Sequence, residues 1–231
     1  MTDETPLKDR ALECFGSAGD EALDRFLDAI GDRQALIGLC ADLLLHFYWV
    51  RQDLPRALKY GRRGVALHGK GDDGHAVKGI CYNMASFTWP GWDEPGIGIG
   101  PAELEVGLEA ARMNLDLARD LGRGDLAEAR ALWMLACHHL ARGDHAEALG
   151  RFDLSIEAYR KTDESNERLM CRGFRQITRI LAGDETARGE LDAILEKLVA
   201  SGEGAAFAGQ IETALNYFTR SREERNPHDN C

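Results

Sequence analysis

The chain has 231 residues and carries 39 Asp and Glu against 28 Lys and Arg, a formal net charge of −11. That length suits one domain with a sizeable core, or two small ones. An acidic surface repels nucleic-acid phosphates and anionic lipid headgroups, so we expect no nucleic acid and no membrane among the partners. Ala and Leu far outnumber Val, Ile and Thr, which predicts an all-α fold.

The sequence also bears on the compartment. Residues 1–6 lack the basic and apolar segments of a secretory signal. The densest apolar run, residues 43–50, is shorter than the ~18 residues of a membrane span. The six cysteines lie singly, and four of them fall in apolar helical stretches, as reduced core thiols do. We therefore expect a soluble, cytoplasmic protein.

Gly-Asp dipeptides indicate where helices end and begin. Glycine adopts the left-handed conformation that ends a helix, and aspartate accepts hydrogen bonds from the free amides that open the next one. The dipeptide stands at residues 19–20, 31–32, 71–72, 124–125, 143–144 and 183–184. With the helical spacing of apolar residues, it predicts helices over residues 6–15, 20–30, 32–51, 53–68, 73–88, 102–121, 125–142, 145–161, 165–181, 185–200 and 204–220.

Self-comparison reveals an internal repeat. Copies begin at Leu39, Gly79, Arg130 and Met170, at offsets of 40, 51 and 40 residues. The alignment pairs Trp49 with Trp89 and keeps the turn signal in register. A Pro- and Gly-rich insertion at residues 88–101 accounts for the longer middle offset. The repeat predicts helical hairpins that bury their apolar faces by stacking on one another.

Several glycines fall inside the predicted helices, where each costs ~1 kcal/mol of helix propensity. We expect close approach between helices to offset that cost. The positions are Gly38, Gly61, Gly64, Gly79, Gly150 and Gly173.

The copy over residues 129–159 has the most specific packing pattern. Its apolar and small residues are Leu132, Leu135, Ala136, Ala148, Phe152 and Ser155, on either side of the turn at residues 143–144. This copy resembles a tetratricopeptide repeat (TPR). In the copy after Leu169, Arg172, Arg175 and Arg188 replace the expected packing residues. The resemblance implies a right-handed α-α superhelix, a TPR-like solenoid of about five helical hairpins with a C-terminal capping helix. It implies one domain over residues 1–220, followed by a polar tail over 221–231.

In proteins of this family the first helix of each hairpin lines a concave groove. Carrying those positions over, and adding Trp92 of the insertion, gives an apolar and aromatic groove with a few polar points. The implied partner-binding residues are Asp42, His46, Trp49, Tyr82, Asn83, Trp89, Trp92, Arg130, Trp133, Met134 and Phe174. Such a groove suits recognition of a helix. The alternative is that these residues are core, covered by the last helix of the chain.

The insertion itself has two interpretations. Trp92, followed by Asp93 and Glu94, would present an aromatic anchor with an acidic rim to a partner. Alternatively, the loop folds back over apolar surface and buries Trp89 and Ile97.

Motifs for metal binding or catalysis are weak. Residues 137–139 read Cys-His-His, but neighbouring helical residues point about 100° apart and no ligand follows at the spacing of one turn. The glycines at residues 96–100 lack the spacing of a phosphate loop. We therefore expect no metal, no cofactor and no enzymatic activity.

These observations predict a protein-protein interaction scaffold or adaptor that binds a peptide or helix in its concave groove. Two alternatives remain. The first is a self-assembling homo-oligomer with a self-complementary groove or loop. The second is a small-ligand sensor or enzyme with an enclosed pocket near His46, Tyr82 and Trp89.

Overall fold

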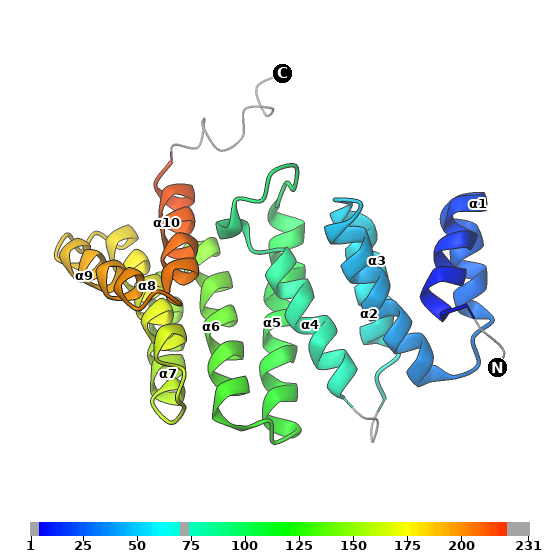
Figure 1. The fold of residues 1–231 in the computed structure, drawn as a ribbon, viewed down its shortest axis with the longest axis horizontal. Coiled ribbons are helices and arrows are strands. Elements are labelled where there is room, and N and C mark those ends of the chain that lie inside the picture. Colours follow the sequence, from blue (N-terminus) through cyan, green and yellow to red (C-terminus); the bar gives the residue numbers. More distant parts are fainter. Residues whose placement is uncertain (1–4, 70–73, 221–231) are drawn as a thin grey trace. The chain divides into compact units, whose positions relative to one another are not determined.

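A computed structural model describes residues 5–69 and 74–220. In this part of the chain the regular structure consists of ten α-helices and one 3-10 helix, without a strand (Figure 1). The all-α prediction is confirmed. None of these helices is both long enough and apolar enough to cross a membrane. The chain divides into two compact units, Met1–Met84 and Ala85–Cys231.

The first unit contains α1 (Leu7–Asp28), α2 (Arg33–Trp49), α3 (Leu54–Ala66) and most of α4 (His75–Phe87). The expected turn at residues 19–20 is a break within α1, where Gly19 has a φ of 70°. Asp32 begins α2 by accepting hydrogen bonds from the amides of Gln34 and Ala35. Asp53 accepts one from Arg56 at the start of α3. The aspartate cap predicted at residues 31–32 is confirmed, and Asp53 caps α3 in the same way without a preceding glycine.

Close packing in the first unit depends on two glycines of α3. A Cβ atom at Gly61 would lie 2.8 Å from the sulfur of Met84, and one at Gly64 would lie 2.6 Å from Cδ1 of Ile80. The close approach expected at these positions is confirmed, and Gly173 of the second unit shows it too. It is absent at Gly38, Gly79 and Gly150, where an added Cβ would meet no atom within 4 Å.

An ion-pair ladder joins α1 to α3. Three aspartates, one per helical turn of α1, face three cations of α3. The pairs are Arg56 with Asp20, Lys59 with Asp24 and Arg63 with Asp28, at 3.0, 2.7 and 2.6 Å. Because these side chains are partly exposed, we expect each ion pair to add little to the stability of the fold.

The second unit contains η1 (Pro90–Trp92), α5 (Pro101–Asp120), α6 (Gly124–Arg142), α7 (His145–Tyr159), α8 (Ser165–Leu181), α9 (Ala187–Ala200) and α10 (Ala205–Thr219). From α5 to α9, each helix packs on the next. α10 departs from this series: besides α9, which precedes it, it packs on α8 and η1. In Figure 1, α10 lies in orange beside α8 and α9.

The helix boundaries agree with the sequence prediction to within a few residues. Gly143 ends α6 and Gly183 follows α8, with left-handed φ values of 80° and 93°. Asp184 accepts a hydrogen bond from the amide of Thr186. The Gly-Asp pair at residues 71–72, the first residues of the helix predicted over 73–88 and the tail at 221–231 lie outside the described residues.

Helix α6 is the centre of the second unit. Its residues from Ala131 to Leu140 are all buried, because α5 and α7 cover two sides of it and α8 contacts a third. The hydroxyl of Ser155 on α7 donates to the carbonyl of Ala129 at 2.7 Å. His138 shares a hydrogen bond of 2.9 Å, through Nε2, with the carbonyl of Ala85. These bonds satisfy polar groups that would otherwise be costly to bury.

Candidate functional site

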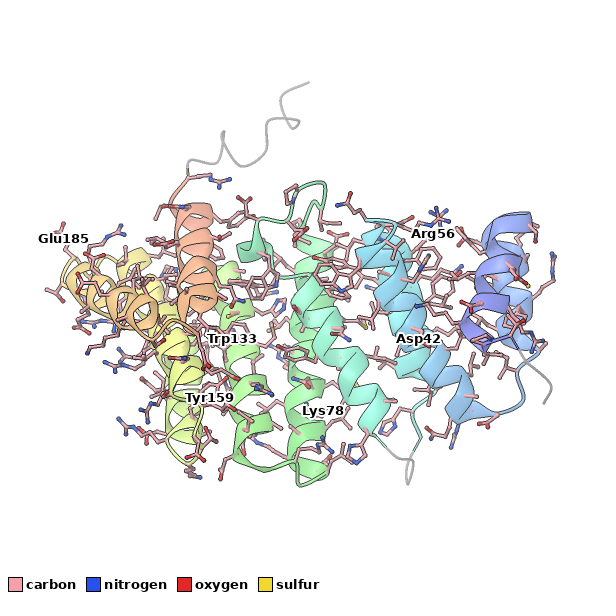
Figure 2. All side chains as sticks on the ribbon, viewed as in Figure 1. Asp42, Arg56, Lys78, Trp133, Tyr159 and Glu185 are labelled. Carbon is pink, nitrogen blue, oxygen red and sulfur yellow. The ribbon has the colours of Figure 1, made fainter. Side chains whose placement is uncertain are left out.

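The structure brings four of the predicted groove residues together in the second unit. Trp89 follows α4, Trp92 lies on η1, Trp133 on α6 and Phe174 on α8. The ring centroid of Trp89 lies 4.8 Å from that of Trp92 and 5.4 Å from that of Phe174, and both ring pairs are edge to face. Trp133 lies 5.6 Å from Phe174 and 6.1 Å from Trp92. We call these four residues the aromatic cluster. Figure 2 labels Trp133 on α6.

The cluster is buried in this structure. Trp89, Trp133 and Phe174 expose 1%, 4% and 0% of their surface, and Trp92 is half-buried. The insertion thus folds back onto the unit, with Trp89 buried and Ile97 half-buried. The indole N–H of Trp89 donates to the carbonyl of Cys137 at 2.9 Å.

The two other indole groups of the cluster differ. The N–H of Trp92 donates to the carbonyl of Ser86 at 2.9 Å. The N–H of Trp133 is buried and finds no acceptor among the described residues. A buried donor without an acceptor costs about 1–3 kcal/mol of stability. The indole N–H of Trp133 is such a donor, surrounded by aromatic rings.

Helix α10 packs beside the cluster, against η1 and α8. The ring of Phe218 lies 6.1 Å from that of Trp89. Ile211 is fully buried and packs where Gly173 of α8 has no side chain. At the end of α10, Arg220 forms an ion pair of 2.6 Å with Asp93 of the loop after η1. These contacts agree with the alternative interpretation of the sequence, in which residues of the predicted groove are core and the last helix packs against them.

The remaining predicted residues of the second unit lie outside this contact. Met134 is fully buried in α6. Arg130 is exposed and forms a bidentate ion pair with Glu167 of α8. Burial opposes ionisation of Glu167, but the hydrogen bonds from Arg130 and Tyr159 outweigh it and lower the pKa of that carboxyl. Arg130 thus joins α6 to α8.

The predicted residues of the first unit are more accessible. Asp42, His46 and Trp49 recur at the spacing of one face of α2. Asp42 is exposed, His46 is half-buried and Trp49 exposes 61% of its surface. Burial and the positive charges of Lys8 and Arg51 lower the pKa of His46. Tyr82 and Asn83 of α4 are half-buried.

A cavity that the sequence did not predict lies between α7, α8 and α9. Its volume is about 510 Å³. Its lining is largely charged, with the four guanidinium groups of Arg160, Arg168, Arg172 and Arg175. Arg172 and Arg175 are two of the residues that depart from the repeat pattern. That departure was the one sequence feature that could have indicated the cavity, but from the sequence alone it showed only that this copy fits the repeat pattern less well.

Set against protein-family models and against the sequences of curated proteins, the chain matches none. The candidate sites therefore stand on the geometry of this chain alone.

Proposed function

We propose that this chain is a protein-binding scaffold, and that the aromatic cluster of the second unit is a groove for a partner's helix. The observation that carries this proposal is that α10 packs against Trp89, η1 and α8, which contribute three of the residues that the TPR resemblance placed in the groove. The proposal includes stacking of the hairpins as a TPR-like superhelix, in which the first helix of each hairpin contributes to the groove.

The spacing of the α10 contacts supports a groove for helices. Ala208, Ile211 and Ala214 are the buried residues of α10, and Phe218 follows one turn later. Anchors at successive turns of one helical face are the pattern by which a helix is bound in a groove. Two of these anchors are alanines, which bury little apolar surface. A partner helix with larger side chains at those positions would bury more.

In this proposal α10 is the resting occupant of the groove. A tethered segment has an effective concentration in the millimolar range, so a partner must overcome that advantage to displace it. An acceptor on the partner, placed against the indole N–H of Trp133, would satisfy the unmatched donor. Such a bond is available only to a helix that presents a polar group at that point.

A peptide-binding experiment tests the proposal. The probe is a fluorescent synthetic peptide of residues 205–220, added to the full-length chain carrying Ile211→Ser and Phe218→Ser. These changes remove two anchors of α10, so the groove is vacated and the peptide binds at least ten-fold more tightly than to the unchanged chain. The matched control is Glu212→Ser, on the exposed face of α10, which leaves peptide binding weak.

Hydrogen exchange over residues 205–219 reports whether α10 has left the groove. Release of α10 in the double variant, with the rest of the second unit still protected but no peptide bound, would contradict the groove. A groove variant, Trp133→Phe, supplies the converse test, because it keeps the ring packing and removes the N–H. We expect it to change the affinity for peptides that place a polar group there and not for the 205–220 peptide.

Self-assembly is a second candidate function, favoured by one observation in the first unit. Trp49 and Val50 at the end of α2 expose 61% and 67% of their surfaces, and adjacent large apolar residues at a surface are typical of contacts between proteins. Sedimentation across a range of concentrations, on the unchanged chain and on Trp49→Ser, tests this function. A monomer at every concentration would exclude it.

A further inference from the structure

The cavity between α7, α8 and α9 is lined by four arginines and three carboxylates, a small positive excess on a chain whose net charge is −11. Arg168, Arg172 and Arg175 follow one another at spacings of four and three residues, so they share one face of α8. Arg160, after the end of α7, completes the set. Ile156 of α7 adds an apolar portion to the lining.

The acidic side chains of the cavity are already matched by cations. Asp153 pairs with Arg175 at 2.7 Å, and Glu157 pairs with Arg160 at 2.5 Å. Glu190, the third, pairs with Arg179 at 3.0 Å. Its carboxylate also accepts a hydrogen bond of 2.9 Å from the side-chain amide of Gln176.

Two arginines of the lining have no such match. Among the described residues, Arg168 and Arg172 form neither an ion pair nor a side-chain hydrogen bond. They stand one helical turn apart, and like charges at that spacing repel each other. Arg172 also replaces an apolar packing residue of the repeat. The lining therefore includes two guanidinium groups, of the half-buried Arg168 and the exposed Arg172, that no acidic side chain of the described residues compensates.

We propose that this cavity binds a phosphate monoester, with Arg168 and Arg172 as the residues that hold the phosphate. Each guanidinium group presents a planar fork of N–H donors. A phosphate monoester has three terminal oxygens and close to two negative charges at neutral pH. It thus satisfies two forks and two charges at once, whereas a single carboxylate offers two oxygens and one charge.

The size of the cavity and the net charge of the chain restrict the class of ligand further. A volume of about 510 Å³ lies in the range of small-molecule sites, so the organic part of the ligand has room beside the phosphate. The net charge of −11 disfavours an extended polyanion such as nucleic acid. The ligand is therefore a compact phosphate monoester, carried by a small molecule or by a phosphorylated side chain of a protein.

Isothermal titration of the full-length chain at low salt tests the assignment. The probes are phenyl phosphate, a phosphoserine peptide, the same peptide without phosphate, and succinate as a dicarboxylate. We expect binding of both phosphate monoesters, and binding at least ten-fold weaker for the other two probes. The tighter of the two monoesters identifies the small-molecule or the peptide source.

Variants assign the binding to the two arginines. Arg168→Gln with Arg172→Gln weakens binding of phenyl phosphate at least ten-fold. Arg172→Lys keeps the charge but loses the fork, so it weakens binding by a smaller factor. The matched control is Arg188→Gln, an exposed arginine of α9 that does not line the cavity, and it leaves the affinity unchanged.

Three results would overturn the proposal: no binding of either monoester by the unchanged chain at millimolar concentration, equal binding of succinate, or unchanged affinity in the double variant. Circular dichroism of the variant verifies that it is folded. The lining of this cavity shares no residue with the aromatic cluster or with α10. Failure of the helix-binding groove would therefore leave this test intact.

Discussion

Gly173 of α8 and Ile211 of α10 fit together as a hole and a knob. A Cβ atom at Gly173 would lie 2.5 Å from Cδ1 of Ile211, closer than Cβ atoms approach other atoms in folded proteins, and 3.0 Å from Cγ1. A glycine is unfavourable inside a helix such as α8. Because it has no side chain, however, Ile211 of α10 can pack against it.

Substitution of this glycine should loosen α10. We expect Gly173→Val to displace Ile211 and to speed hydrogen exchange of residues 205–219, while α5 to α7 keep their protection. The matched control is Gly209→Ala on α10, where an added Cβ meets no atom within 4 Å. This control should gain up to about 1 kcal/mol of stability from helix propensity. Slow exchange of α10 in Gly173→Val would contradict the fit.

Trp49 and Trp89 should differ in their contribution to stability, although the repeat aligns them. Trp89 is 1% exposed and its N–H is hydrogen-bonded, so Trp89→Ala should lower the free energy of unfolding by about 3–5 kcal/mol. Trp49 is 61% exposed, so Trp49→Ala should lower it by less than about 1 kcal/mol. Urea unfolding followed by circular dichroism measures both. Equal losses would show that the two positions are equivalent.

The buried imidazole of His138 should make stability depend on pH. Burial lowers its pKa from 6.5 to about 4, with a smaller effect of His139 in the same direction, although the hydrogen bond to Ala85 opposes the shift. Between these two values the unfolded chain binds a proton that the folded chain does not. The free energy of unfolding should therefore fall as the pH is lowered from 6.5 towards 4, by up to about 1.4 kcal/mol per pH unit.

The variant His138→Gln should reduce this slope, because the glutamine amide does not titrate and still reaches the carbonyl of Ala85. His145→Gln, at the start of α7, is the matched control and should keep the slope. Urea midpoints measured from pH 5 to 7 give the comparison. The same slope in His138→Gln would assign it to other groups.

Four cysteines should resist alkylation in the folded state. Burial raises the pKa of Cys40 to about 11 and those of Cys81 and Cys171 to about 12, and it raises the pKa of Cys137 well above 9.0. Little thiolate forms at neutral pH, and the thiolate is the reactive species. Among the cysteines of the described residues, we expect iodoacetamide to modify the half-buried Cys14 first, as read by peptide mass spectrometry. In urea all of them should react at similar rates, and similar rates without urea would contradict their burial.

The sequence predicted the local structure of this chain well. Helix ends follow from residues that act on the backbone beside them, such as the left-handed Gly143 and the capping Asp32. The break within α1 at Gly19 follows from the same chemistry. The sequence also placed Trp89, Trp92, Trp133 and Phe174 among the eleven candidate groove residues, and the structure brings the rings of these four together.

The tertiary structure alone decided what covers those neighbours and where the charged cavity lies. Apolar spacing shows that a helix has a face to bury, but it left open whether the last helix covers the candidate residues, and in the structure α10 packs against Trp89, η1 and α8. The sequence alone could not distinguish Arg168 and Arg172 from arginines with partners, because pairing depends on side chains brought close by folding. Backbone preferences act between adjacent residues and can be predicted along the chain, whereas burial and charge compensation depend on distances that only the packed helices set.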